Sequence, residues 1–171
     1  MNKLLVIGVS GAGKSTLARR LSDTLNLPFF PSDSFYWEAD WQIAHPDKVR
    51  QQINDVLSRS AWIFDGNFDE EHEFVWKQAD CILWLDYSLP TILTQVITRN
   101  LRWTLTRQTV WSGNQMTLPR AVSGIRHALR SYASKQETHP RWLSELKGVD
   151  IHRFRSRKET ELWVKDLAIS A

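Results

Sequence analysis

An octapeptide near the amino terminus constrains this chain more than any other feature. Residues 8–15 read Gly-Val-Ser-Gly-Ala-Gly-Lys-Ser and match the pattern G-x-x-x-x-G-K-[ST]. The apolar run before them, residues 3–7, is typical of a strand buried on both faces, and residues 16–21 have helical periodicity. A glycine loop between a strand and a helix predicts a phosphate-binding loop (P-loop), whose main-chain N–H groups and helix dipole bind a polyphosphate.

The individual positions of the loop predict individual contacts. Its glycines allow the tight turn, Lys14 can reach the β- and γ-phosphates of a nucleotide, and the Ser15 hydroxyl can bind Mg²⁺. The cofactor-binding residues that we expect here are Gly8, Ser10, Gly11, Ala12, Gly13, Lys14, Ser15 and Thr16. The alternative is a glycine-rich turn that opens an ordinary helix; the flanking strand and helix favour the P-loop.

Size and composition fit one domain over residues 1–171. The chain is 42% hydrophobic, which is enough for a substantial core. We expect no signal peptide, and no apolar run approaches the ~20 residues that span a bilayer. Cys81 is the single cysteine, so an internal disulfide is excluded, and its apolar surroundings predict a buried, inert thiol. These features predict a cytoplasmic protein without a membrane partner, as a monomer or small homo-oligomer.

Charge is distributed unevenly along the chain. Residues 1–98 contain 8 Lys/Arg and 13 Asp/Glu, whereas residues 99–171 contain 14 Lys/Arg and 6 Asp/Glu. A basic second half can bind nucleic acid, or it can gather arginines around phosphates. The spacing of Arg99, Arg102 and Arg107 within one predicted helix favours phosphates, because the chain has no recognisable nucleic-acid-binding motif.

Strands alternate with helices after the P-loop. Four further strands are predicted, at residues 27–30, 62–64, 81–85 and 150–154. Helices are predicted from Pro46 onwards, over 69–78, from Pro90 to about Val110, over 119–134, over 140–146, and after a capping box formed by Ser156 and Glu159. The alternation predicts an α/β layer fold with a parallel sheet that binds its ligands at the carboxyl ends of the strands.

Three carboxylates follow predicted strands. Asp65 and Asp86 both end hydrophobic strands, so either could order the Mg²⁺ of a P-loop enzyme. Gly66 favours Asp65, because a glycine lets the backbone approach a ligand, and Asp86 is then a turn or capping residue. Asp33 follows the second strand; it could accept a proton from an acceptor hydroxyl, or it could form an Asx-turn.

Aromatic and basic side chains leave two interpretations open. Trp37 and Trp41 could stack on a ring of a ligand, or they could belong to the core or to a lid. The three arginines could stabilise a transferring phosphoryl group from a mobile lid at about residues 99–118, or they could form a solvated helix face. The five histidines show no metal-ligand spacing.

Several segments together resemble one protein family. They are residues 8–16, the Asp33…Trp37…Trp41 stretch, residues 62–68, residues 79–86 and the closing Arg153–Glu159. They resemble the adenylate-kinase-like P-loop kinases of the group labelled DNA topology modulation proteins. The resemblance is specific over the first 90 residues and looser from 91 to 148.

The resemblance implies a three-layer fold with a five-stranded parallel sheet, ordered 2-3-1-4-5, and a helical lid. It implies ATP and Mg²⁺ as cofactors, with Ser15 and Asp65 as the metal-side residues. Asp33, Trp37 and Asn67 then face the acceptor, Arg99 matches a lid-helix arginine, and Arg155 and Ser156 lie near the adenine. Gln95 stands where the family usually has another arginine.

The sequence as a whole predicts an ATP-dependent kinase that phosphorylates a small acceptor, nucleotide-like acceptors included. The predicted catalytic residues are Lys14, Asp33 and Arg99, and the predicted substrate-binding residues are Asp33, Trp37, Asn67, Arg102 and Arg107. The alternative is a nucleotide-dependent regulatory or nucleic-acid-binding P-loop protein. A GTPase fits less well, because the chain contains neither D-x-x-G nor N-K-x-D.

Overall fold

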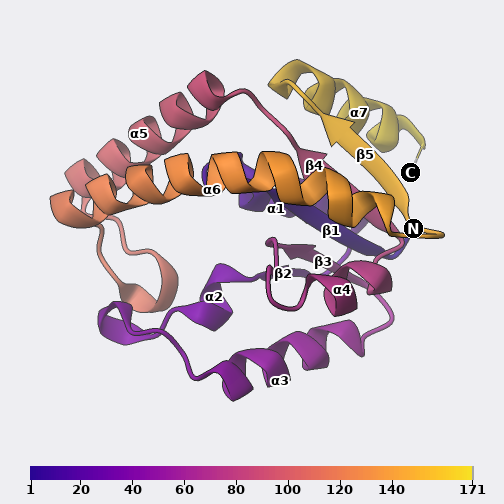
Figure 1. Cartoon of the computed structure of the whole chain (residues 1–171), viewed down its shortest axis with the longest axis horizontal. Coiled ribbons are helices and arrows are strands. Elements are labelled where there is room, and N and C mark those ends of the chain that lie inside the picture. Colours follow the sequence, from indigo (N-terminus) through magenta and orange to yellow (C-terminus); the bar gives the residue numbers. More distant parts are fainter. Residues whose placement is uncertain (171) are drawn as a thin grey trace.

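Five parallel strands form one sheet in the order β2-β3-β1-β4-β5 (Figure 1). The computed structural model describes residues 1–170. The strands are β1 (Lys3–Gly8), β2 (Phe29–Pro31), β3 (Trp62–Asp65), β4 (Cys81–Leu85) and β5 (Asp150–Phe154). The predicted fold class and strand order are therefore confirmed.

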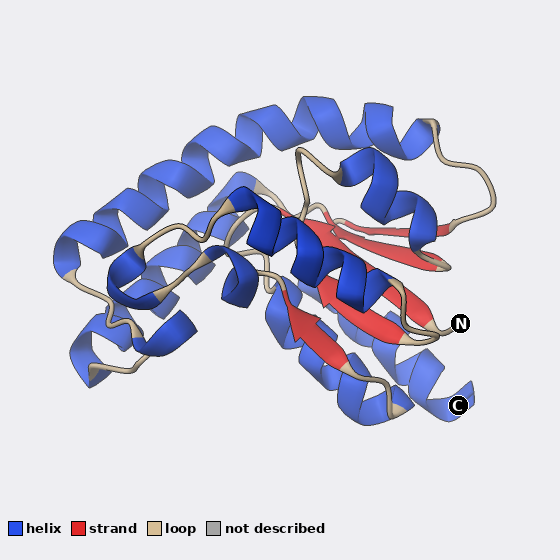
Figure 2. Cartoon of the chain, turned by 90° about the horizontal axis from the view of Figure 1, so that it is seen from below, coloured by secondary structure: helices blue, strands red, loops and turns tan. Residues whose placement is uncertain are grey.

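Helices cover both faces of the sheet (Figures 1 and 2). The helices are α1 (Lys14–Leu25), α2 (Asp33–Tyr36), α3 (Pro46–Leu57), α4 (His72–Val75), α5 (Leu89–Thr106), α6 (Leu118–Ser144) and α7 (Arg157–Ser170). Three short 3-10 turns lie between them: η1 (Ala39–Trp41), η2 (Trp76–Gln78) and η3 (Trp111–Gly113).

The central strand β1 is buried on both sides. Leu4 and Val6 pack on the core that includes α1 and α7, whereas Leu5 and Ile7 pack on the core that includes α3 and α4. This alternation follows from the two-residue repeat of a strand, and all four side chains are fully buried. The fully apolar run that indicated a central strand thus fills two hydrophobic cores at once.

The register brings three strand ends together. Val6 lies opposite Asp65 of β3, and Gly8 lies opposite Leu85 of β4. Residues that follow these three strands therefore meet at one edge of the sheet, as expected for ligand sites in parallel sheets. The P-loop emerges at the centre of this edge.

One long helix replaces the two helices predicted over residues 119–134 and 140–146. α6 continues through Pro140, although proline removes a helical hydrogen bond. Lys135, His139 and Leu143 are all buried at four-residue spacing, so one face of α6 packs on both sides of the proline. Packing therefore outweighs the local cost of Pro140.

Two other helices are shorter than predicted. The segment 69–78 forms only the four-residue α4 followed by η2, and the helix from Pro90 ends at Thr106 rather than near Val110. Arg107 adopts left-handed backbone angles (φ 49°) and so ends α5. None of the described helices has the length and apolar character needed to cross a membrane.

Candidate functional site

The P-loop connects β1 to α1 and is packed tightly on α5. Ser10 to Gly13 form the turn, in which the Ala12 N–H donates to the Val9 carbonyl (3.0 Å), and Ser15 and Thr16 lie in the first turn of α1. Gly11 has φ 87°, and a β-carbon there would lie 2.1 Å from Val96 Cγ2. A glycine is therefore required at this position by both backbone angle and space.

The Lys14 side chain folds back over the P-loop that precedes it in the sequence. Its Nζ donates hydrogen bonds to the carbonyl oxygens of Gly8 (3.0 Å) and Val9 (3.3 Å). Burial lowers the pKa of Lys14 from its ordinary value, and the nearby Asp33 and Asp65 oppose this shift. The half-buried ammonium is therefore bonded to the loop, and it lies within electrostatic range of two carboxylates.

Asp33 begins the short helix α2, directly after β2. Burial raises the pKa of its carboxyl above the ordinary value, while Lys14 and Arg99 favour the ionised form. The structure thus places Lys14 and Arg99 within electrostatic range of Asp33, although the three residues lie in separate parts of the chain. A carboxylate with a raised pKa beside two cations is suited to exchanging a proton with a ligand.

Arg99 is the one of the three predicted arginines that lies near Asp33. It is half-buried on α5, its guanidinium carbon is 4.7 Å from the centre of the Trp103 ring, and its Nε donates to Asn100 Oδ1 (3.3 Å). Burial lowers its pKa, and Asp33 opposes this shift. Arg102 and Arg107 are exposed, as in the alternative of a solvated helix face.

The two candidate metal-side carboxylates have different surroundings. Asp65 is 3% exposed, and one carboxylate oxygen accepts the N–H of Ser32 (2.9 Å). Asp86 accepts hydrogen bonds from Arg153 Nε (2.9 Å) and Nη2 (2.6 Å) and from Gln136 Nε2 (2.6 Å). Its two oxygens are therefore already engaged, which agrees with a structural role for Asp86.

Asn67 contacts the P-loop itself. Its Oδ1 accepts the N–H of Gly8 (3.0 Å), and its main-chain oxygen accepts the indole N–H of Trp76 (2.9 Å). The neighbouring Gly66 has φ 140°, and a β-carbon there would lie 2.4 Å from Ser32 Oγ. The segment predicted to face an acceptor thus also holds the start of the loop in place.

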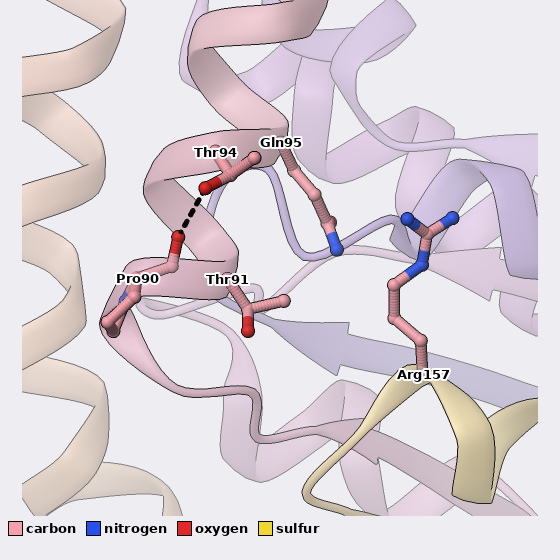
Figure 3. Close-up of a pocket in the computed structure, with 5 residues that line it drawn as sticks. All are labelled: Pro90, Thr91, Thr94, Gln95 and Arg157. Atoms are coloured by element: carbon pink, nitrogen blue, oxygen red, sulfur yellow. Dashed lines mark hydrogen bonds between the residues drawn. The ribbon is translucent and has the colours of Figure 1, made fainter.

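A cavity of about 310 Å³ lies beside the loop. It is lined by Pro90, Thr91, Thr94, Gln95 and Arg157, and Figure 3 shows Gln95 and Arg157 extending into the same space from α5 and α7. The Gln95 Oε1 comes within 3.9 Å of the place that a β-carbon of Gly13 would take, so the cavity adjoins the P-loop.

The residues predicted near an adenine take part in a helix cap. The Arg155 N–H donates to Glu159 Oε2 (2.8 Å), and Ser156 Oγ donates to Glu159 Oε1 (3.0 Å). Arg157, which the sequence analysis did not select, is the basic residue of this segment that lines the cavity. Its position three residues after the end of β5, at the start of α7, is the signal that could have identified it.

A second residue missed from sequence is Lys135 of α6. Its ammonium forms an ion pair with Asp69, and it lies 5.2 Å from the centre of the Trp142 ring. Its side chain is only 6% exposed. This pair fixes α6 on the segment that follows Asn67, and a lone lysine between helical residues gives no sequence signal for such a contact.

Two loops that are distant in the sequence meet at one side of the site. Asn114 Oδ1 accepts the N–H of Trp41 (2.9 Å), and Asn114 Nδ2 donates to the carbonyl of Glu38 (2.8 Å). Ser112 Oγ donates to the carbonyl of Trp37 (2.5 Å). We call this contact between residues 37–43 and 109–115 the loop clasp. Asn114 is 6% exposed, and its Nδ2 also donates to the Trp111 carbonyl of its own loop (2.9 Å).

The tryptophans of the clasp contact one another. The Trp37 and Trp41 rings meet edge to face at 5.4 Å, and Trp41 meets Trp111 at 6.1 Å. The three rings therefore pack on one another across the clasp, in the edge-to-face arrangement that aromatic pairs prefer.

Comparison with protein-family models and with curated proteins finds no match. Solved structures do match in fold. A shikimate kinase from Bacteroides thetaiotaomicron has a TM-score of 0.59 at 15% identity, covering 98% of this chain and 96% of that chain. A shikimate kinase from Acinetobacter baumannii in complex with shikimate has a TM-score of 0.56 at 16% identity, covering 99% and 90%.

A gluconokinase from Sinorhizobium meliloti 1021 gives a TM-score of 0.53 at 12% identity, covering 99% of this chain and 94% of that chain. The chain therefore has the fold of the adenylate-kinase-like P-loop kinases. The finer resemblance to the group labelled DNA topology modulation proteins stays a prediction.

Proposed function

We propose that this protein is an ATP-dependent kinase that transfers the γ-phosphoryl group to a hydroxyl group of a small molecule. The observation that carries the proposal is the meeting of Asp33, Lys14 and Arg99 at the mouth of a P-loop. A purely structural α/β domain has no need for a carboxylate and two cations at that place, whereas kinases use such groups to orient the acceptor and to stabilise the transferring phosphoryl group.

In this proposal the P-loop N–H groups and Lys14 bind the phosphates of ATP. The nucleoside lies in the cavity between α5 and α7, with Gln95 and Arg157 on its walls. Ser15 and Asp65 offer a hydroxyl and a carboxylate oxygen, which are the hard donors that Mg²⁺ prefers. When bound there, Mg²⁺ would neutralise phosphate charge.

The chemical step then uses residues that face the loop. Asp33 accepts the proton of the acceptor hydroxyl, whose oxygen forms a bond to the γ-phosphorus as the bond to the β-phosphate oxygen breaks, and ADP leaves. Arg99 and Lys14 stabilise the charge on the transferring group. The lid region at about 99–118, held to residues 37–43 by the loop clasp, would keep water out and so limit ATP hydrolysis.

The test is a phosphoryl-transfer screen with ATP and Mg²⁺ against sugars, small hydroxy acids, nucleosides and nucleotides. We expect product with one of these classes, and a loss of at least about 100-fold in kcat for Lys14→Ala. Lys165→Ala, an exposed lysine change on α7, is the matched control and should retain full activity. Transfer by Lys14→Ala at the rate of the control would refute the proposed role of the loop.

A further inference from the structure

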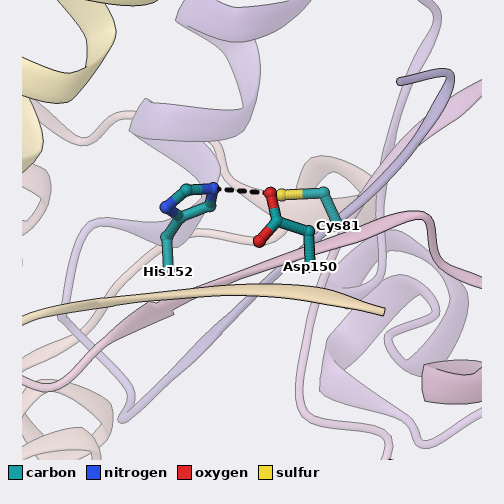
Figure 4. Close-up of side chains that lie close together, drawn as sticks. All are labelled: Cys81, Asp150 and His152. Atoms are coloured by element: carbon teal, nitrogen blue, oxygen red, sulfur yellow. Dashed lines mark hydrogen bonds and ion pairs between the residues drawn. The ribbon is translucent and has the colours of Figure 1, made fainter. Parts of the chain in front are cut away.

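Three side chains with metal-binding atoms meet at the end of the sheet opposite the P-loop. Cys81 and Asp150 are the first residues of β4 and β5, and His152 follows two residues later (Figure 4). The Cys81 sulfur, a carboxylate oxygen of Asp150 and a ring nitrogen of His152 all lie within 4.8 Å of one another. His152 Nε2 and Asp150 Oδ2 are 3.0 Å apart.

The sheet register produces this cluster. Cys81 lies directly opposite Asp150 on the neighbouring strand, and Leu83 lies opposite His152. Asp150 and His152 are two residues apart, so their side chains leave β5 on the same face. The two strands therefore hold all three groups at a fixed spacing, without a contribution from any flexible loop.

We propose that Cys81, Asp150 and His152 bind a zinc ion. Sulfur, imidazole nitrogen and carboxylate oxygen are the three kinds of ligand that Zn²⁺ takes in proteins, and three protein ligands leave a fourth position for water. Mg²⁺ and Ca²⁺ fit this set poorly, because they bind through oxygen. Binding releases the thiol proton to solvent, and the thiolate and carboxylate then balance the charge of the ion.

The burial of the three residues suits an ion that enters from the surface. Cys81 is fully buried, whereas the side chains of Asp150 and His152 are 66% and 32% exposed. The His152 ring is held from behind by Trp163, with ring centres 5.1 Å apart. The sulfur thus forms the floor of the site, and the other two ligands form its rim.

The position of the site indicates what a bound ion would do for the sheet. The site joins β4 to β5, and β5 is an edge strand: within residues 1–170 no further strand pairs with its other side. An ion there would fix an edge strand that otherwise pairs on one side only. The site lies away from the P-loop, so this inference stands independently of the proposed kinase activity.

The experiment uses the full-length chain, freed of metal with a chelator and carrying no histidine tag. Co²⁺ is the first probe, because a cobalt–thiolate bond gives a charge-transfer absorption band and Cys81 is the only cysteine that can produce it. Competition with Zn²⁺ then gives the zinc affinity. We expect one equivalent of Co²⁺, displaced by Zn²⁺, with half-saturation below about 100 µM.

Three variants test the three ligands. Cys81→Ser should lose the absorption band, and His152→Gln and Asp150→Asn should each weaken Zn²⁺ binding by at least about tenfold. The two rim changes keep the buried core intact, so they remain informative if Cys81→Ser fails to fold. His45→Gln is the matched control, because His45 and Asp47 form a similar exposed pair (3.5 Å) without a cysteine; its binding should not change.

Thermal unfolding gives a second measurement. Zn²⁺ at about 100 times its dissociation constant should raise the Tm by roughly 5–10 °C, and this rise should disappear in His152→Gln. The proposal is overturned if wild-type protein gives no thiolate band below about 100 µM Co²⁺, or if His152→Gln and Asp150→Asn both bind Zn²⁺ like the control. Neither result depends on whether the protein phosphorylates anything.

Discussion

Replacing His139 by phenylalanine should remove a large part of the sensitivity of this protein to acid. His139 is fully buried on α6, and neither of its ring nitrogens has a hydrogen-bond partner among the described residues 1–170. The rings of Trp76, Trp84 and Trp142 surround it, at centre-to-centre distances of 5.4, 5.8 and 6.1 Å. A phenylalanine ring therefore suits this place better than an imidazolium ion.

The pKa of His139 sets the size of the effect. It is lowered from 6.5 to about 3, mainly by burial, and the charges of Lys135 and Lys14, together with His72, contribute to the same shift. Between these two pKa values the unfolded chain binds a proton that the folded chain does not. Stability is therefore complete above pH 6.5 and falls as the pH falls towards 3, by up to about 1.4 kcal/mol per pH unit.

The measurement is urea unfolding of wild type and His139→Phe at about pH 7.5 and about pH 5. With the pKa values above, the histidine should cost the wild type about 2 kcal/mol of unfolding free energy between these two conditions. Other titrating groups are common to both proteins and cancel in the difference. The variant should therefore lose about 2 kcal/mol less than wild type on acidification.

A surface histidine provides the control. His127 is exposed on the same helix, so His127→Phe should leave the pH dependence of unfolding like that of wild type. If wild type and His139→Phe lose the same free energy on going to pH 5, the folded protein accommodates a protonated His139, and the argument from burial is wrong.

Two further predictions concern the candidate site. Asp33→Asn should lower kcat by about 10²- to 10⁴-fold. The wild-type kcat should fall as the pH drops through a pKa above the ordinary carboxyl range, because only ionised Asp33 can accept a proton. A wild-type kcat that stays constant down to the ordinary carboxyl pKa would contradict the assignment. Asn114→Ala should break the hydrogen bonds of Asn114 in the loop clasp and lower the free energy of local unfolding of the two loops by about 1–3 kcal/mol. Amide hydrogen exchange should therefore become faster in residues 37–43 as well as in 109–115. Unchanged protection of residues 37–43 would show that the loops are not coupled.

The sequence predicted the sheet and the P-loop well, because these depend on local pattern. A short strand such as Leu4 to Ile7 is typically fully apolar where both faces of its sheet are covered, and these residues are indeed fully buried. The spacing of the glycines before Lys14 is also typical of one kind of loop. The capping contact of Ser156 with Glu159 is likewise local and was predicted. The strand order came from a family resemblance rather than from the residues alone.

Features that depend on distant packing were predicted less well. A proline at residue 140 locally favours the end of a helix, yet buried contacts on either side carry α6 through it. The pairing of Lys135 with Asp69 and the place of Arg157 on the cavity wall depend on tertiary contacts that no periodicity reports. The sequence also could not distinguish the surroundings of Asp65 from those of Asp86. Only the structure shows that Arg153 and Gln136 donate hydrogen bonds to the Asp86 carboxylate.

The loop clasp has a consequence for how such a protein could change its substrate. A single amide side chain, Asn114, bonds to the main chain of residues 38 and 41, so the backbone position of one loop is tied to the side chain of the other. Substitutions in the two loops should therefore show epistasis rather than add independently. Mutant libraries that vary both loops at once should yield altered acceptor preferences that one-loop libraries fail to reach.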